Sequence, residues 1–517
     1  MGTTTLIELP DEERAGSPPP APPEPPRTGG GLARNTLVYG AGIVARRIAS
    51  FIMLPVYTHY LTPADYGVLE LLQLTVDIAV ILVSAGTTAG LLRFYFKAPN
   101  ERERNATIVS AFALLTALNF IATVVLLLAA GPIADVALRG AASPMLVRIV
   151  ALDLLLQGAV SVPMTLMQAR GRAMLHSVTS LVTLLGQLGL NILLVVVLQK
   201  GVAGVLVSTL VTHLVGGAFL VAWMLRQTGW RISREAMRNL RRFAVPYQLT
   251  TAGTFILTFG DRFVIQAVRS AGEVGLYSLA YKFGFLLATL AAAPFMTAWT
   301  PQRFAAALMP RGERDRMYSS GFRYLNMVVL STAVGIALFV DPLLHIMSDP
   351  AFHVAARLVP IIVLAYVFQA WSDVVQFGID ASEQTRYVTY ATWGAAVPLV
   401  AGYLVLIPLF GGYGAAVATL IGFVVRFILM LVFAQRVWPV SYEWSSILAL
   451  LGWAGAATVV YHTVAPATLV TQLALATLIG AVYLVGGAAV ALRPEERRHI
   501  QQVVFAMVKR MRVLASA

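Results

Sequence analysis

The chain has 517 residues, of which 58% are hydrophobic and only 12% are charged, and its mean hydropathy is +0.75. A soluble domain carries about 25% charged residues, so this composition excludes an ordinary soluble enzyme, a nucleic-acid-binding domain and a disordered chain. The net charge of +13 indicates loop arginines that set membrane topology, and the absence of cysteine excludes disulfides and thiolate chemistry.

Residues 1–34 differ in composition from the rest of the chain. They combine five acidic residues with a dense run of prolines between Pro18 and Pro26. Such a segment buries too little apolar surface to fold alone, and it lacks the basic start and apolar run of a signal peptide. We expect a disordered, proline-rich cytoplasmic tail; a ligand for SH3-like modules is the alternative.

From Asn35 onward, apolar runs of roughly 20 to 25 residues alternate with short breaks, and a helix of that length crosses about 30 Å of hydrocarbon. Because the alternation typical of membrane β-strands is missing, the sequence predicts an all-α, polytopic membrane helix bundle. We expect about 14 transmembrane helices. Their ranges are 35–60, 66–94, 106–130, 144–168, 174–199, 202–225, 243–268, 275–299, 319–340, 357–379, 387–409, 413–436, 446–464 and 468–491.

Basic residues gather in alternate connections between these helices. One set holds most of the loop arginines, and the other holds only Arg139, Lys200, Arg269 and Arg357. The positive-inside rule makes the first set cytoplasmic, so both termini are expected in the cytoplasm of a multi-pass cell (inner) membrane protein. Residues 494–514 combine apolar residues at helical spacing with basic ones, which predicts an amphipathic helix on the cytoplasmic leaflet or on cytoplasmic loops.

The two halves of the chain resemble each other at an offset of 208 to 210 positions. Asp65 and Gly67 before one apolar run correspond to Glu273 and Gly275 before another. Six helices separate the copies, so both halves insert the same way round, and parallel repeats of this kind bind substrate at their interface and rock. The predicted domains are an N-terminal lobe at 35–226, a basic cytoplasmic linker at 227–242, a C-terminal lobe at 243–437 and two extra helices at 444–492.

Ten ionisable residues inside the predicted spans are selected as candidates. They are Arg46, Arg47, Asp77, Arg148, Asp153, Asp261, Arg262, Lys282, Asp373 and Arg426. A charge at mid-bilayer costs at least about 2.5–3.5 kcal/mol, so it normally faces a wet cavity or a partner. Six cations against four acids favour an anionic substrate, and a diphosphate suits the paired donors of arginine.

These residues divide into candidate roles. The substrate-binding candidates are Arg46, Arg47, Arg262, Lys282 and Arg426, while Arg148 is expected to snorkel to the surface. The acids Asp77, Asp153, Asp261 and Asp373 are candidates for coupling-ion ligands or for structural partners of arginines. Because neighbours on a helix point about 100° apart, we expect that Asp261 does not simply neutralise Arg262.

Two motifs carry a family resemblance. They are Gly-Ala-Gly-Ile-Val-Ala-Arg-Arg at 40–47, and Phe-Gly-Asp-Arg at 259–262 followed by Glu-Val-Gly-Leu-Tyr at 273–277. Over about residues 35–492, the chain resembles the Wzx-type polysaccharide-biosynthesis flippases of the multidrug/oligosaccharidyl-lipid/polysaccharide exporter superfamily. The acidic, proline-rich N-terminal tail departs from the common pattern of that family.

The resemblance implies two six-helix lobes in a V, with two extra helices and a central cationic cavity. That cavity would take the diphosphate and sugars of an undecaprenyl-linked oligosaccharide, with the lipid tail outside, and lobe rocking would carry the head group to the periplasmic leaflet. Arg46 or Arg47, together with Arg262, match the basic cavity residues of the family. The implied partners are the lipid-linked oligosaccharide, membrane lipids and polysaccharide polymerase and export machinery, with a monomeric protein.

Other functions remain open at this point. A drug or cation antiporter of the same superfamily would couple ions through N-lobe acids, for which Asp77 and Asp153 are the candidates. A lipid II flippase would share the mechanism. A membrane enzyme is disfavoured because the loops are short and basic, and the sequence has no metal motif, cofactor motif or P-loop for ATP.

Overall fold

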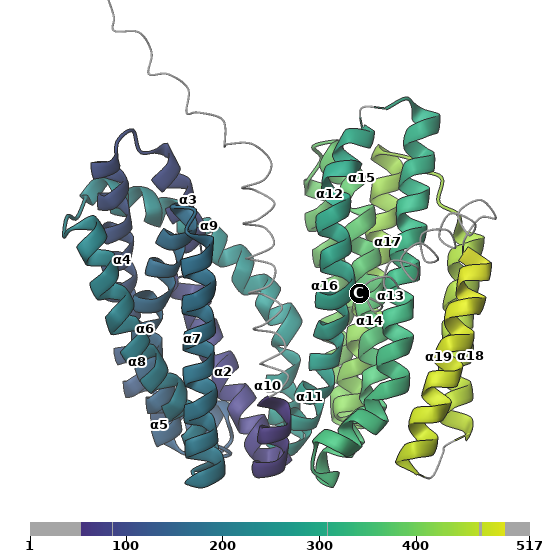
Figure 1. Cartoon of the computed structure of the whole chain (residues 1–517), viewed down its shortest axis with the longest axis horizontal. Helices are drawn as coiled ribbons and strands as arrows, with labels where there is room; N and C mark the ends of the chain where they lie inside the picture. The colour runs from purple at the N-terminus through teal and green to yellow at the C-terminus, as the bar shows by residue number, and fades with distance from the viewer. Residues whose placement is uncertain (1–52, 85, 308, 465–467, 492–517) are drawn as a thin grey trace, which may run out of the picture.

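A computed structural model describes residues 53–84, 86–307, 309–464 and 468–491 (Figure 1). The described residues form helices and connections without strands, which confirms the predicted all-α membrane bundle. Within them, twelve helical segments are long and apolar enough to cross a membrane. The predicted seventh span corresponds to α9 (Arg234–Phe259) and α10 (Asp261–Val268), and only residues 53–60 of the predicted first span are described.

The N-terminal bundle contains the helices from α2 to α8. Their bounds are α2 (Pro63–Ser84), α3 (Thr87–Lys97), α4 (Glu101–Leu128), α5 (Ala130–Pro132), η1 (Ile133–Ala137), α6 (Pro144–Ala169), α7 (Ala173–Asn191), η2 (Ile192–Val197) and α8 (Gly201–Thr228). Each long helix falls on a predicted span. The helix α9 begins inside the predicted basic linker and packs against α2, α3 and α4 before it leads to the second bundle.

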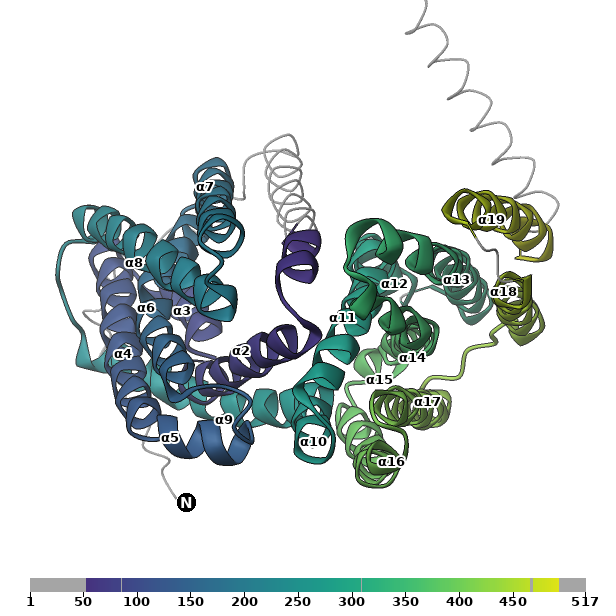
Figure 2. The ribbon, with the colours of Figure 1, turned by 90° about the horizontal axis from the view of Figure 1, so that it is seen from below.

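The C-terminal bundle begins at α11 and is followed by two further helices. Its bounds are α11 (Ala271–Leu287), η3 (Ala288–Ala292), α12 (Ala293–Ala307), α13 (Arg311–Met347), η4 (Pro350–Leu358), α14 (Val359–Val375), α15 (Phe377–Ala381), α16 (Arg386–Phe410) and α17 (Gly412–Val437), then α18 (Trp444–Val464) and α19 (Leu469–Ala491). The uncharged pair α18 and α19 packs against α13 at the outer edge of the molecule (Figure 2).

The two bundles form a V. They meet near α10 and α11 at the lower end of Figure 1 and separate toward the upper end, where α4 begins after α3. One buried apolar core crosses the closed end and includes Leu71 of the first bundle and Tyr277 of the second. The described residues of the two bundles therefore pack against each other at one end of their helices.

The closed end depends on a contact between two glycines that the sequence repeat had paired. Gly67 of α2 and Gly275 of α11 lie so close that a Cβ on Gly275 would overlap the carbonyl oxygen of Pro63 and approach the nitrogen of Gly67 to 3.0 Å. The start of α11 is fixed locally, because the Ser270 side chain accepts a hydrogen bond from the backbone N–H of Glu273. The two repeat units thus touch through backbone at equivalent positions.

Candidate functional site

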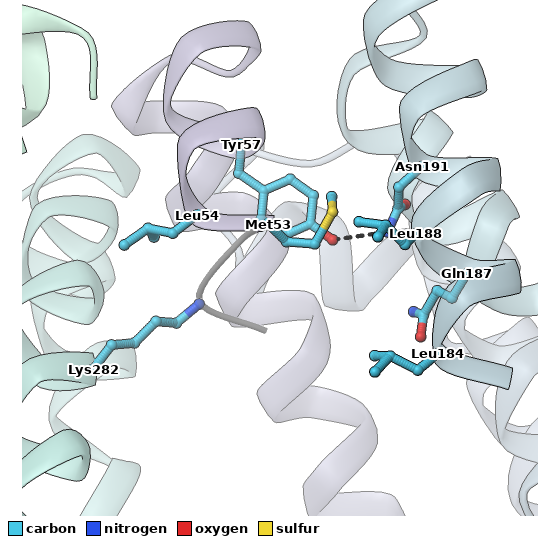
Figure 3. Close-up of a pocket in the computed structure, with 8 residues that line it drawn as sticks. All are labelled: Met53, Leu54, Tyr57, Leu184, Gln187, Leu188, Asn191 and Lys282. Atoms are coloured by element: carbon cyan, nitrogen blue, oxygen red, sulfur yellow. Dashed lines mark hydrogen bonds between the residues drawn. The ribbon is translucent and has the colours of Figure 1, made fainter. Parts of the chain in front are cut away.

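A cavity of about 160 Å³ lies between the two bundles, on the side of residues 53–60 and α7 (Figure 3). Its lining residues are Met53, Leu54, Tyr57, Leu184, Gln187, Leu188, Asn191 and Lys282. All except Lys282 belong to the N-terminal bundle or to the helical segment 53–60 that precedes it. This volume is below that of pockets for drug-sized ligands, so the cavity suits a compact charged group better than a whole oligosaccharide.

Lys282 supplies the positive charge in this cavity. Its Nζ lies 2.9 Å from Oε1 of Glu70 on α2 and 4.9 Å from the centre of the Tyr66 ring. The lysine side chain keeps 41% of its surface exposed, so it remains accessible from the cavity while it is paired. Lys282 therefore holds an ion pair between the two bundles and also faces the space between them.

Glu70 is a residue that the sequence analysis missed. It lies within the predicted second span, where placing its carboxylate in the membrane costs as much free energy as placing that of Asp77, which was selected as a candidate. A complete list of acids inside the spans would have found it. Its partner on α11, more than two hundred residues away, could not have been identified from the sequence alone.

The opposite wall of the cavity offers uncharged hydrogen-bonding groups. The amide nitrogen of Asn191 donates to the Tyr57 hydroxyl at 3.0 Å, and the Ser208 hydroxyl donates to the Asn191 amide oxygen. Nearby, the Gln187 amide donates to the Thr209 hydroxyl at 2.9 Å. The site thus combines one cation with neutral polar groups, a combination suited to a ligand that carries both negative charge and hydroxyl groups.

Arg262 lies beside this site but is buried. Its NH1 contacts Oδ1 of Asp261 at 2.7 Å, and its guanidinium lies 4.0 Å from the centre of the Tyr281 ring. The rings of Phe259 and Tyr277 lie about 5 Å from the same group. The Tyr277 hydroxyl donates to the second Asp261 oxygen at 2.6 Å. In this conformation Arg262 is thus enclosed by aromatic rings.

The expectation that Asp261 would not neutralise Arg262 is wrong. The two residues form a buried ion pair because Oδ1 of Asp261 turns toward the next residue, where it accepts hydrogen bonds from both the backbone N–H and NH1 of Arg262. The Arg262 side chain folds back toward α9 and also donates to the Thr258 carbonyl at 3.2 Å. The 100° between neighbouring side chains on a helix therefore does not prevent a long arginine side chain from reaching its neighbour.

Arg426 and Asp373 lie together in the C-terminal bundle. Arg426 NH2 is 3.6 Å from Asp373 Oδ1, which favours a structural-partner role for this acid. Arg426 also lines a cavity of about 170 Å³ with Thr258 and Phe423. That cavity is separate from the one that contains Lys282.

The remaining predicted residues lie apart from the Lys282 cavity or outside the described chain. Asp153 is buried and pairs with Nδ1 of His213 at 2.7 Å, so its partner is a histidine rather than an arginine. Asp77 accepts a hydrogen bond from the Gln73 amide at 3.3 Å, and Arg148 is exposed. Arg46 and Arg47 lie outside the described residues, as do the N-terminal tail 1–34 and the predicted helix 494–514.

Comparison with solved structures places this fold among known transporters. The lipid II flippase MurJ in an inward closed conformation matches with a TM-score of 0.69 and 10% identity, covering 86% of this chain and 98% of that chain. A multidrug resistance MATE family transporter of the MOP superfamily, in an inward-facing conformation, matches with a TM-score of 0.59 and 15% identity, covering 75% of this chain and 94% of that chain.

A third structure is a MOP superfamily transporter from Pyrococcus furiosus, described as having a binding pocket of reverse polarity. It matches with a TM-score of 0.52 and 14% identity, covering 78% of this chain and 94% of that chain. At these low identities the matches show a shared fold, and the twelve apolar helices indicate a multi-pass membrane protein. A search of curated proteins gives no significant match.

The sequence itself matches a family. A family model described as polysaccharide biosynthesis protein matches residues 32–306, which is more than half of the chain. This match and the shared fold confirm the resemblance inferred from the helix-1 and helix-7 motifs. The chain therefore belongs to the polysaccharide biosynthesis protein family and has the fold of the MOP superfamily.

Proposed function

We propose that this protein is a flippase that moves an undecaprenyl-diphosphate-linked oligosaccharide repeat unit from the cytoplasmic to the periplasmic leaflet for polysaccharide biosynthesis. The observation that carries the proposal is Lys282, a partly exposed cation in a cavity between two bundles of a polysaccharide biosynthesis family member. On such a substrate, the diphosphate is the group that a cation in this cavity would bind.

In the proposed mechanism, Glu70 occupies the place of the substrate anion while the site is empty. Its carboxylate keeps Lys282 paired and holds α2 against α11. An incoming phosphate would replace that carboxylate as the partner of Lys282, and the ion pair between the bundles would be lost. Substrate binding would therefore weaken a contact that stabilises the present conformation. A ligand shifts a conformational equilibrium only when it interacts differently with the two conformations, and loss of this ion pair would supply that difference.

The proposed orientation follows from the basic loops. The V opens at the end where α4 begins, and Lys97 at the end of α3 and Arg102 and Arg104 at the start of α4 lie at this end. The positive-inside rule assigns this end to the cytoplasm. The described conformation would then load from the cytoplasmic leaflet of the inner membrane, with both termini in the cytoplasm. Polysaccharide polymerase and export machinery would take over the flipped product from a monomeric transporter.

The test uses a strain that lacks the gene. We expect undecaprenyl-diphosphate oligosaccharide to accumulate in the inner leaflet, with loss of a surface polysaccharide. Wild-type protein should clear this pool, and Lys282→Gln should not. Lys200→Gln, which removes an exposed lysine between α7 and α8, is the matched control and should clear the pool like the wild type.

Two outcomes would contradict the proposed function, and a third would contradict the proposed site. A normal lipid-linked pool with altered sensitivity to cationic drugs would indicate the antiporter. Accumulation of lipid II with defective peptidoglycan would indicate the lipid II flippase. Full clearance by Lys282→Gln would leave the flippase class intact and remove Lys282 from the substrate site.

A further inference from the structure

A second groove, of about 490 Å³, lies between α4 and α9, away from the Lys282 cavity. It is lined by three arginines and three apolar residues, namely Arg238, Arg241, Arg242, Leu114, Met237 and Val245. All three arginines are exposed, and within the described part of the chain they form no ion pair or hydrogen bond. The groove thus presents three available guanidinium groups beside an apolar floor.

An apolar groove lies farther along α4, and the two grooves together are called the track. This apolar groove, of about 480 Å³, is lined from α4 by Leu118, Ile121 and Val125, and from α2, η1 and α10 by further side chains of which only Thr75 is polar. Leu118 follows Leu114 by one helical turn, or about 6 Å along the axis. The two grooves together are charged toward the start of α4 and apolar toward its middle and end.

The arginines have a physical reason to bind an anion from the lipid. Exposed basic residues beside a membrane-spanning helix attract the negative headgroups of the cytoplasmic leaflet.

The track is distinct from the proposed transport site. On α2, Glu70 faces Lys282, whereas Ala79 lines the apolar groove. Nine residues at 100° each place these two side chains on opposite faces of the helix. A ligand in the track would therefore contact the wall of the N-terminal bundle that faces away from Lys282.

We propose that this track binds an anionic phospholipid of the membrane, with its phosphate on the arginines and an acyl chain along α4. Guanidinium groups bind phosphate oxygens through paired donors, and the apolar groove lies on the side where the acyl chains of that leaflet would run. A zwitterionic lipid is disfavoured because its ammonium group would meet three cations. Since α9 leads from one bundle to the other, the bound lipid fastens the helix that connects them.

The test measures retention of lipid by the full-length protein, purified in detergent and mixed with phosphatidylglycerol, by native mass spectrometry. Each basic residue near a membrane surface contributes a factor of about 5 in affinity for anionic lipid, so R238Q/R241Q/R242Q should bind about 100-fold more weakly. The matched control is R311Q/R316Q/R436Q, which removes three exposed arginines of the C-terminal bundle and should bind like the wild type.

A second pair of variants tests the acyl-chain portion without changing charge. Val125→Trp fills the apolar groove and should weaken binding of phosphatidylglycerol several-fold. Val124→Trp, at an exposed neighbouring position that does not line the groove, should not. This pair keeps the proposal testable if the triple arginine variant fails to fold.

Several results would overturn the proposal. They are unchanged binding in both R238Q/R241Q/R242Q and Val125→Trp, equal retention of phosphatidylcholine, or displacement of phosphatidylglycerol by stoichiometric undecaprenyl phosphate, which would assign the track to the transported lipid. Because the assay measures binding in detergent, its outcome does not depend on the proposed flippase activity.

Discussion

The glycine contact between α2 and α11 predicts that one added methyl group will change the relative position of the bundles. In Gly275→Ala, the new Cβ would overlap the Pro63 carbonyl oxygen and lie 3.0 Å from the Gly67 nitrogen. Ordinary van der Waals contact begins at 3.4 Å, so α2 must move at least 0.4 Å at Gly67 and farther at Pro63. Both contacts are backbone atoms and cannot relax by a rotamer change.

The energetic effect follows from this overlap. Overpacking a tight contact costs about 1–3 kcal/mol. The cost applies only to the described conformation, in which α2 and α11 are in contact. Gly275→Ala should therefore shift the equilibrium between this conformation and one closed at the opposite end by a factor of about 5 to 150. The bundles should separate at Gly275 and approach each other at the opposite end.

Distances between spin labels can measure this change. The chain has no cysteine, so Arg102→Cys on α4 and Arg316→Cys on α13 provide one labelled site on each bundle, both near the open end. We expect the distance distribution to shift to shorter values in Gly275→Ala. Gly335→Ala is the control, because a methyl group there meets no atom within 4 Å.

The reasoning would be refuted by one result in particular. If Gly275→Ala and Gly335→Ala both gave the wild-type distribution, the contact at the closed end would not limit the movement of the bundles. The same would hold if Gly275→Ala lengthened the distance at the open end.

Three further predictions concern stability, topology and the tail. Arg262→Ala leaves the buried Asp261 without a cation, with only hydrogen bonds from the Tyr277 hydroxyl and the backbone N–H of residue 262, and should lower the free energy of unfolding by about 3–5 kcal/mol, measured by thermal unfolding in detergent. The neutral pair D261N/R262Q should lose less, and an equal loss would contradict the ion-pair explanation. Arg231→Cys, in the connection before α9, should react with a membrane-impermeant reagent only from the cytoplasmic side; labelling in intact cells would reverse the topology. Deletion of residues 1–30 should leave transport nearly unchanged. Loss of transport in this truncated protein would show that the tail is needed for activity.

The helical spans were predictable because length and hydropathy determine them locally. Every predicted span from 66–94 onward overlaps helical segments in the described chain, and the repeat correctly paired Gly67 with Gly275. Charge partners were harder to predict. The choice of Glu70 for Lys282 depends on how two bundles pack, and the pairing of Asp261 with Arg262 depends on side-chain conformations that a helical wheel does not represent.

The ion pair between Glu70 and Lys282 has a consequence for how membrane voltage would act on the transport cycle. The pair contributes no net charge, whereas a diphosphate diester brings two negative charges. Moving each negative charge outward across an inside-negative potential of 100 mV releases about 2.3 kcal/mol. With the proposed cargo, the membrane potential would favour outward movement of the negative charges in the loaded protein. The ion pair would then form again, and the return step would carry no cargo charge back. Voltage alone would then give the cycle its direction, without a coupling ion.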